Sequence, residues 1–291
     1  MRLSLPVFAA RCLLACAFGA VGLCALVTAR PAHAQDDNFT PFVISLDEVV
    51  HRMLRMAELG PDDYLIDLGS GDGRIPITAA RQYGSRGLGV DLDPDLVDLA
   101  RRNAVREGVQ GKVSFEVRDL FATDLSKASV VAFYLLPNVT EELRPKLLRE
   151  LKPGTRIIAH DYDLGEWLAD EWTSIRVPDK PVAPVGESRV FLWVVPGDAR
   201  GRWDSRLEGK PLRLEIAQTY QMLKVKATLD GVPVDVRGAR LRGEELRLVL
   251  YAADNVHRVS GLLKGGRLEG HVESGSQRNP TRSAWSAVRA P

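Results

Sequence analysis

The chain has 291 residues, which is enough for one or two domains. Hydrophobic residues make up 45% of the chain and charged residues 26%. These values are ordinary for a globular protein and exclude the disordered and fibrous classes. The formal net charge of +1 argues against a protein built mainly to bind nucleic acid, which would usually be more basic.

The first 34 residues are typical of a secretory signal peptide. A weakly basic start ends at Arg11, 18 uncharged residues follow over positions 12–29, and Ala32-His33-Ala34 forms a small-x-small cleavage pattern. We therefore expect export to the periplasm or envelope. An uncleaved anchor is one alternative, because 18 helical residues span about 27 Å, and it would be the protein's membrane contact. A misassigned start, which would leave a cytoplasmic protein, is another.

Cysteines and histidines limit the chemistry of the mature chain. All three cysteines lie in the N-terminal segment, so a chain that begins at Gln35 contains none. This excludes disulfides, thiolate nucleophiles and cysteine-ligated zinc. The four histidines beyond that segment show no metal-ligand spacing, and we expect no metal site.

Residues 35–196 alternate between helical and strand patterns. Ser45-Leu46-Asp47-Glu48 is a capping box that predicts the start of a helix. Further helices are predicted over 74–83, 94–107 and 141–151, and strands over 64–68, 87–90, 113–117, 130–136, 156–159, 172–177 and 189–195. Repeated strand–helix units predict an α/β fold with a parallel sheet, whose ligands bind outside the carboxyl ends of the strands.

Residues 197–291 have a different hydrophobic period. Leucines, valines and isoleucines alternate with polar residues around 212–216, 223–229, 232–236 and 246–250, and glycines separate the runs. This predicts a small antiparallel domain of seven or eight strands, in a curled sheet or barrel-like sandwich. Charge also differs, at net +6 here and −8 over 35–196. The runs lack interleaved aromatic residues, which argues against nucleic acid as a partner.

A glycine-rich loop after the strand at 64–68 is the clearest chemical signal. Asp67 is followed by Gly69, Gly71 and Gly73 at alternate positions. A dinucleotide fingerprint would place its third glycine one residue later. A buried carboxylate would also repel a pyrophosphate, whereas Asp67 suits a ligand with a cationic amino group.

Two further carboxylates end the neighbouring strands. Asp91 lies 20 residues after Gly71, where it can accept both hydroxyls of a ribose, and Asp119 can accept an adenine amino group. The structural alternatives are a helix N-cap for Asp91 and a turn residue for Asp119. A ligand with ammonium, ribose and adenine but no phosphate is S-adenosylmethionine.

These motifs resemble the class I S-adenosylmethionine-dependent methyltransferases. The match lies in residues 67–74, 89–93 and 117–120. The resemblance is closest to the ATP synthase c-subunit lysine methyltransferase-like group and its prokaryotic relatives. It is carried by D-L-G-S-G-D-G-R-I from Asp67, by Tyr134-Leu135-Leu136-Pro137, by residues 147–151 and by residues 156–167. That group often has Glu where Asp91 stands, and the resemblance covers about residues 40–196.

The resemblance implies a Rossmann-like seven-stranded methyltransferase sheet over residues 35–196, between a signal peptide at 1–34 and the antiparallel β domain at 197–291. It also implies S-adenosylmethionine as cofactor, with protein lysine as a possible methyl acceptor. The residues implied in cofactor binding are Asp67, Gly69, Ser70, Gly71, Gly73, Asp91, Leu92, Asp119 and Leu120.

Candidate catalytic residues follow two other strands. Methyl transfer from a sulfonium is an in-line displacement, for which the protein supplies position and electrostatics. His160, Asp161 and Asp163 lie at a strand end and could take a proton from an amine or orient it. Tyr134 ends the neighbouring strand and would wall the acceptor pocket. A polar loop without a catalytic role is the alternative for residues 160–163.

Two functions remain open from the sequence. The first is an S-adenosylmethionine-dependent methyltransferase. The second is an exported binding module that keeps the fold without turnover, because the cofactor is made in the cytoplasm whereas the N-terminus predicts export.

Overall fold

The computed structural model describes residues 44–180, 184–252, 255–275 and 280–290. The predicted signal segment, residues 1–34, lies outside these ranges. None of the helices in the described ranges is both long enough and apolar enough to span a bilayer.

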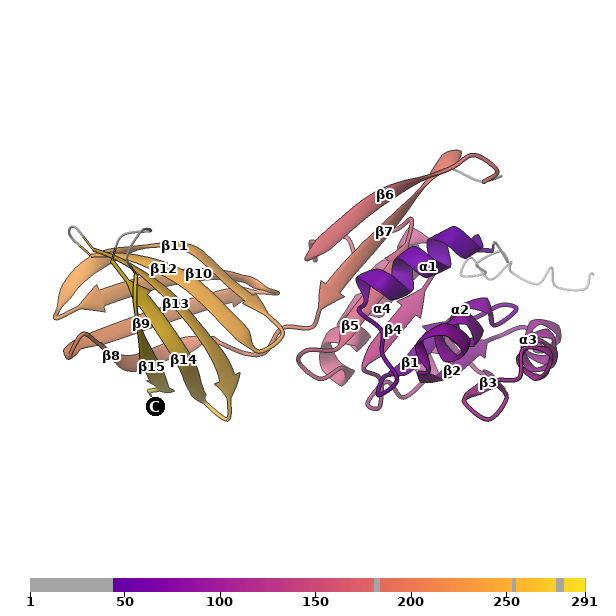
Figure 1. The fold of residues 1–291 in the computed structure, drawn as a ribbon, viewed down its shortest axis with the longest axis horizontal. Helices are drawn as coiled ribbons and strands as arrows, with labels where there is room; N and C mark the ends of the chain where they lie inside the picture. Colours follow the sequence, from indigo (N-terminus) through magenta and orange to yellow (C-terminus); the bar gives the residue numbers. More distant parts are fainter. Residues whose placement is uncertain (1–43, 181–183, 253–254, 276–279, 291) are drawn as a thin grey trace, which may run out of the picture. The chain divides into compact units, whose positions relative to one another are not determined.

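Seven strands form the first sheet, in the order β3-β2-β1-β4-β5-β7-β6 (Figure 1). Five of them are parallel, and β7 runs antiparallel to both β5 and β6. The strands are β1 Tyr64–Leu68, β2 Arg86–Asp91, β3 Val113–Val117, β4 Val130–Phe133, β5 Arg156–His160, β6 Glu171–Val177 and β7 Gly186–Val194. The strand order reverses between β1 and β4, which places the ligand-binding switch point at their carboxyl ends. The predicted Rossmann-like sheet of seven strands is confirmed.

Helices cover both faces of this sheet, because successive strand residues point to opposite sides. Leu68 and Phe133 share a core with one side of α4, whereas Leu65 and Ala132 share a separate core with α1. The helices are α1 Asp47–Met56, α2 Arg74–Thr78 with a π-helical continuation over Ala79–Tyr83, α3 Pro94–Arg106, the 3-10 turn Leu120–Ala122 and α4 Pro137–Glu150. The two cores hold the strand ends, and therefore the loops after them, in fixed positions.

Two local expectations about helix starts are wrong. Ser45 does not cap α1, whose N-cap is Leu46, because the Ser45 hydroxyl hydrogen-bonds the distant His160 instead. The strand predicted over 130–136 ends at Phe133, and α4 begins at Pro137 rather than at 141. A proline in the first turn suits a helix start, since its missing N–H has no intrahelical partner there.

Eight antiparallel strands close into a barrel, in the order β10-β11-β12-β13-β14-β15-β8-β9. They are coloured orange to yellow in Figure 1. The strands are β8 Gly201–Leu207, β9 Lys210–Thr219, β10 Met222–Leu229, β11 Val232–Arg242, β12 Glu245–Ala252, β13 Asn255–Lys264, β14 Arg267–Ser274 and β15 Thr281–Arg289. The predicted small antiparallel β domain is confirmed, as a closed barrel.

Alternate residues of each strand fill the interior of the barrel. Leu212, Leu214 and Ile216 of β9 are buried in one cluster with Trp203 and Trp285. Such a filled interior is a packed core, as in other small barrels. The barrel therefore owes its stability to its own apolar centre.

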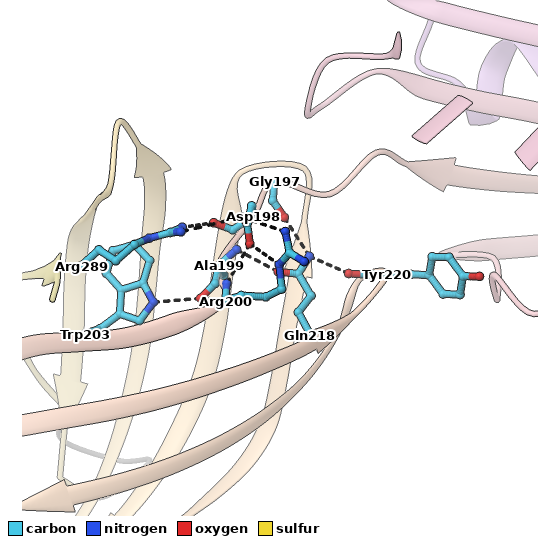
Figure 2. A network of polar contacts seen from close by, with 8 residues as sticks. All are labelled: Gly197, Asp198, Ala199, Arg200, Trp203, Gln218, Tyr220 and Arg289. Atoms are coloured by element: carbon cyan, nitrogen blue, oxygen red, sulfur yellow. Dashed lines mark hydrogen bonds and ion pairs between the residues drawn. The ribbon is translucent and has the colours of Figure 1, made fainter. Parts of the chain in front are cut away.

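Figure 2 shows a polar network in the segment that leads into β8. The Trp203 indole N–H donates to the carbonyl of Ala199 at 2.8 Å, and the Ala199 N–H donates to the Gln218 side chain at 2.8 Å. The Gln218 amide in turn donates to the carbonyls of Gly197 and Tyr220. These bonds fasten residues 197–200 to β9 before the barrel begins.

Candidate functional site

The loop after β1 is shaped by its glycines. Gly69, Gly71 and Gly73 have φ values of 78°, 52° and 80°, in the left-handed region that glycine adopts without steric cost. A side chain at Gly73 would also clash, because its Cβ would lie 2.7 Å from the Phe115 ring. The loop can therefore bring its backbone close to a ligand only with these residues.

Asp91 holds this loop in place. Its Oδ2 accepts the Gly71 N–H at 2.8 Å, and its Oδ1 accepts the Asp93 N–H at 3.1 Å. The N-cap of α3 is Asp93, whose carboxylate accepts from Asp95 and Leu96, so the N-cap alternative for Asp91 is wrong. Asp91 thus stands at the end of β2 beside the glycine loop, as the sequence predicted.

Two apolar residues and a carboxylate border this region. Leu92 is 68% exposed directly after β2, while Leu120 packs partly against the sheet core. Asp119 is exposed after β3, and its Oδ1 accepts the Phe121 N–H at 2.8 Å. Asp119 therefore serves the turn, which was its structural alternative, and it also presents an exposed carboxylate at the strand end.

Asp67 and Ser70 each bury one side-chain oxygen that has no hydrogen-bond partner within the described residues. Asp67 is 1% exposed, and within the described residues its Oδ1 and the Ser70 Oγ have no hydrogen-bond partner. Burial raises the pKa of the Asp67 carboxyl well above its usual range, and the nearby Asp91 and Asp72 carboxylates raise it further. Buried unpaired acceptors are costly, so this pair of atoms points to a cationic or donor group of a ligand.

Arg74 is committed to protein contacts. Its guanidinium pairs with the Asp72 carboxylate at 2.6 Å and donates to the Ser45 carbonyl at 2.9 Å. Arg74 thus pairs with an acid of the same loop. These bonds connect the glycine loop to the residue that precedes α1.

His160 is enclosed behind the acceptor side of the site. It is 2% exposed, with Nδ1 bonded to Ser45 Oγ at 2.8 Å and Nε2 to Ser188 Oγ at 2.9 Å. Burial, opposed by the Asp161 carboxylate and assisted by the Lys180 cation, lowers the pKa of His160 to about 4. The imidazole is thus neutral at pH 7 and uses both nitrogens for protein contacts.

Asp161 and Tyr134 lie together next to this histidine. The Tyr134 hydroxyl donates to Asp161 Oδ2 at 2.9 Å, and the Tyr134 and His160 rings lie 3.9 Å apart between centroids. Burial and the Asp161 carboxylate raise the pKa of the Tyr134 hydroxyl, so it is a neutral phenol. Asp161 has φ 64°, a strained value for a residue with a side chain.

Asp163 is separated from this group. It is exposed, and its carboxylate accepts the Gly165 N–H at 3.0 Å within its own turn. The structure therefore brings together three of the four predicted catalytic residues, Tyr134, His160 and Asp161, and shows Asp163 capping a loop.

Comparisons with known proteins show to which family the chain belongs. Residues 67–171 match the model of the ANTKMT methyltransferase domain. A protein-lysine N-methyltransferase from Saccharolobus islandicus (strain REY15A) is 42% identical over 156 residues, which are 53% of this chain and 93% of that protein. The chain belongs to this family of class I methyltransferases.

Two further proteins are similar to this chain. The ATP synthase c-subunit lysine N-methyltransferase of Rattus norvegicus is 37% identical over 46% of this chain, and the match spans 61% of that enzyme. An RNA methyltransferase of Salinibacter ruber, solved with S-adenosyl-L-homocysteine, is 44% identical over 54% of this chain and 95% of that chain, with a TM-score of 0.49. The matched regions cover about half of this chain.

S-adenosylmethionine is the cofactor of this methyltransferase, and the site fits it. The unpartnered Asp67 carboxylate suits the ammonium of the methionine end, and the glycine loop leaves room for close backbone approach. Among the residues that the structure describes, no group of three or more His, Cys, Asp or Glu could hold a metal ion.

Sequence reasoning missed three residues on the acceptor side of the methyltransferase. Ser45 and Ser188 bond the two nitrogens of His160, and Lys180 bonds Asp161. All three lie outside the region matched by the family model. Lys180 and Ser188 lie between two predicted strands and carry no local signal, while the pattern around Ser45 indicated a helix cap, so only the tertiary fold could reveal these contacts.

Proposed function

We propose that the chain transfers a methyl group from S-adenosylmethionine to the ε-amino group of a protein lysine. The observation that carries the proposal is 42% identity to a protein-lysine N-methyltransferase over nearly all of that protein's length. Relatives named for the ATP synthase c-subunit and for the adenine nucleotide translocase add support, at 37% and 35% identity. The family model ends at residue 171, so the barrel at 197–291 lies outside it, and we propose it as a separate β domain.

We further propose which residues hold the cofactor. Asp67 faces the ammonium, the glycine loop lies along the methionine end, and Asp91 accepts from the ribose while it also anchors Gly71. The exposed apolar Leu92 covers one face of the adenine, and Asp119 accepts its amino group. The full proposed set is Asp67, Gly69, Ser70, Gly71, Gly73, Asp91, Leu92, Asp119 and Leu120.

The acceptor side then has a modest chemical task. Bound S-adenosylmethionine supplies a methyl group activated by its sulfonium. The Tyr134 hydroxyl donates its hydrogen bond to Asp161, so the lone pairs of the phenolic oxygen are left to accept an N–H of the lysine. This contact would orient the amine, whose lone pair must point along the line of displacement. The neutral, buried His160 ring packs against the Tyr134 ring and restricts its position.

Radiolabelled cofactor tests the proposal directly. Residues 35–291 are incubated with methyl-labelled S-adenosylmethionine and an extract of the expression host, divided into protein and RNA. The matched control is the same extract after acetylation of its lysine amines. We expect label in protein, recovered as ε-N-methyllysine after acid hydrolysis and lost from acetylated extract. Label that persists after acetylation, or label in RNA, would overturn a lysine acceptor. Cofactor binding without transfer would favour the binding module.

We also propose that the mature protein works outside the cytoplasm. The support is the order of a basic start, an uncharged run of 18 residues and Ala32-His33-Ala34. A fusion of residues 1–40 to a reporter that is active only after export gives a direct readout. Activity is expected, and a silent reporter with a stable fusion product would place the protein in the cytoplasm.

A further inference from the structure

A buried lysine stands behind the acceptor side of the site. The Lys180 side chain is 4% exposed, and its ammonium donates to Asp161 Oδ2 at 2.5 Å and to the Glu187 carbonyl at 2.7 Å. Lysines are almost never fully buried unless they are paired. Because burying an ion pair costs desolvation energy, a hydrophobic pair would often be as stable at such a place. A contribution to stability is therefore a weak explanation for the presence of a lysine at position 180.

The carboxylate that binds Lys180 cannot touch an acceptor itself. The Asp161 side chain has no exposed surface. Its Oδ2 accepts from both Lys180 and Tyr134, and its Oδ1 accepts the Arg189 N–H at 3.0 Å. Any influence of Asp161 on the reaction must therefore pass through a neighbour. Among these neighbours, Tyr134 is half-buried at the carboxyl end of β4 and can face the site.

Tyr134 lies next to the cofactor loop. It directly follows β4, whose last residue pairs in register with Leu68 of β1. The next residue, Leu135, approaches Gly69 so closely that a Cβ there would lie 3.1 Å from its side chain. The phenolic oxygen thus belongs to the strand end beside the glycine loop. The His160 ring, 3.9 Å away between centroids, and the Tyr162 ring, 6.3 Å away, confine its position.

We propose that Lys180 is a positioning residue that sets the direction of the Tyr134 hydroxyl through Asp161. The Lys180 ammonium holds Asp161 Oδ2 through a charge-assisted hydrogen bond, and Tyr134 donates to the same oxygen. Tyr134 must then donate its proton away from the acceptor pocket, which leaves its oxygen free to accept from the substrate amine. Without the ammonium, Asp161 Oδ2 loses the contact that fixes it, and the phenolic proton is free to turn toward the acceptor. The inference rests on the proposed function, since it assumes an amine with N–H groups.

Kinetics of a double-mutant cycle test the coupling. We expect Lys180→Met to lower the initial rate of label transfer into extract protein about ten-fold or more, because a hydrogen bond to a charged group is lost. The affinity for S-adenosylhomocysteine should stay within about two-fold, since Lys180 lies off the cofactor side. In a Tyr134→Phe background the same substitution should have little further effect, as residues that act as a unit are not additive. Equal losses in both backgrounds, or a wild-type rate in Lys180→Met, would overturn the proposal.

Two controls separate positioning from a general loss of folding. Lys180→Arg keeps the charge and should recover part of the rate lost in Lys180→Met. Lys152→Met removes a charge of the same kind at an exposed position and should leave the rate unchanged. A Lys152→Met variant that loses as much as Lys180→Met would show that the assay follows net charge rather than the Asp161 contact.

A spectroscopic measurement tests the relay without any acceptor. The ultraviolet resonance Raman doublet of tyrosine reports whether its hydroxyl donates or accepts. The Tyr134 signal is obtained by subtracting the spectrum of Tyr134→Phe. We expect donor character in the wild-type chain and in Lys152→Met, and a loss of donor character in Lys180→Met. An unchanged doublet in Lys180→Met would overturn the relay even if lysine methylation holds. A changed doublet without lysine methylation would leave the relay in place and overturn the proposed acceptor.

Discussion

The cofactor side and the acceptor side of the site treat buried polar groups in opposite ways. On the cofactor side, Asp67 and Ser70 each keep a buried oxygen that has no partner within the described residues. On the acceptor side, His160 uses both ring nitrogens and the Asp161 carboxylate accepts three hydrogen bonds. One side is incomplete without a ligand, whereas the other is complete within the protein.

This difference reflects what each side must do. A cofactor that binds tightly can supply the missing donor itself, so an unpaired carboxylate contributes to affinity when the cation arrives. An acceptor only passes through the site, and groups held in place beforehand lower the cost of orienting it. Substitutions on the cofactor side should therefore change binding, and substitutions on the acceptor side should change rate or acid stability.

The largest expected effect comes from adding a methyl group to the glycine loop. Gly73→Ala combines a φ of 80° with a Cβ 2.7 Å from the Phe115 ring, so strain and overpacking act together. We expect a loss of about 3–5 kcal/mol in the free energy of unfolding, measured with urea, and loss of cofactor binding.

Gly108→Ala is the matched control for this prediction. Gly108 also has a positive φ, of 69°, but a Cβ there would meet no atom within 4 Å. It should lose only the backbone term of about 1–2 kcal/mol and keep its affinity for the cofactor. Equal losses in the two variants would mean that the contact with Phe115 does not limit residue 73.

The next largest effect concerns pH. Through His160, the free energy of unfolding should fall by about 3 kcal/mol on acidification. The pKa of His160 is about 4 in the folded chain and 6.5 in its ordinary state. Between these values the unfolded chain binds a proton that the folded chain excludes, so the free energy of unfolding falls as pH decreases. The His160 contribution is fully present above pH 6.5 and is lost down to about pH 4.

Urea titrations at several pH values between about 4 and 7 measure this slope. His160→Asn should lower stability overall, because Ser45 and Ser188 lose their partner, but it should flatten the slope in this window. His51→Gln, on the outer face of α1, should leave the slope as it is. A slope that is the same in His160→Asn and in the wild-type chain would show that His160 titrates normally.

The sequence predicted the cofactor side better than the acceptor side, for a physical reason. Asp67, Gly69 and Gly71 lie within five residues, so a strand, a turn and a helix start are visible together in the chain. His160 and Asp161 were predicted from their place at a strand end, but their partners lie far away in the sequence. Ser45 is 115 positions from His160, and Lys180 is 19 positions from Asp161.

Ser45 shows how a local pattern can be overruled. Its sequence context, with Glu48 three residues later, is that of a capping box. In the structure the hydroxyl serves a buried imidazole, because an unpaired nitrogen in the core would cost more than an uncapped helix start. The need of the buried His160 for a hydrogen-bond partner therefore determines the role of Ser45.

A smaller effect, of about 2 kcal/mol, is expected when the orphan carboxylate is neutralised. Asp67→Asn should weaken binding of both S-adenosylmethionine and S-adenosylhomocysteine about ten-fold or more, since each carries the same ammonium. In the wild-type chain affinity should rise with pH through the raised pKa of Asp67, because only the ionised carboxylate attracts the cation. Calorimetry at several pH values should show this rise in the wild-type chain and a flat profile in Asp67→Asn. A rise retained in the variant would assign the proton to another group.

The smallest effect is expected at the other end of the cofactor. Asp119→Asn keeps an oxygen that can accept both the Phe121 N–H and an adenine amino group, and the residue is exposed, so water screens the lost charge. Affinity for S-adenosylmethionine should fall less than about three-fold, which corresponds to less than about 0.7 kcal/mol.

Asp119→Ala also removes the oxygen. It should lower the free energy of unfolding by about 1 kcal/mol through the lost turn contact, and it should lower the affinity for the cofactor further. Calorimetry and urea unfolding of both variants separate these roles. A loss in Asp119→Asn as large as that in Asp67→Asn would mean that charge, rather than hydrogen bonding, recognises the adenine end, and the two ends of the cofactor would then be bound by the same means.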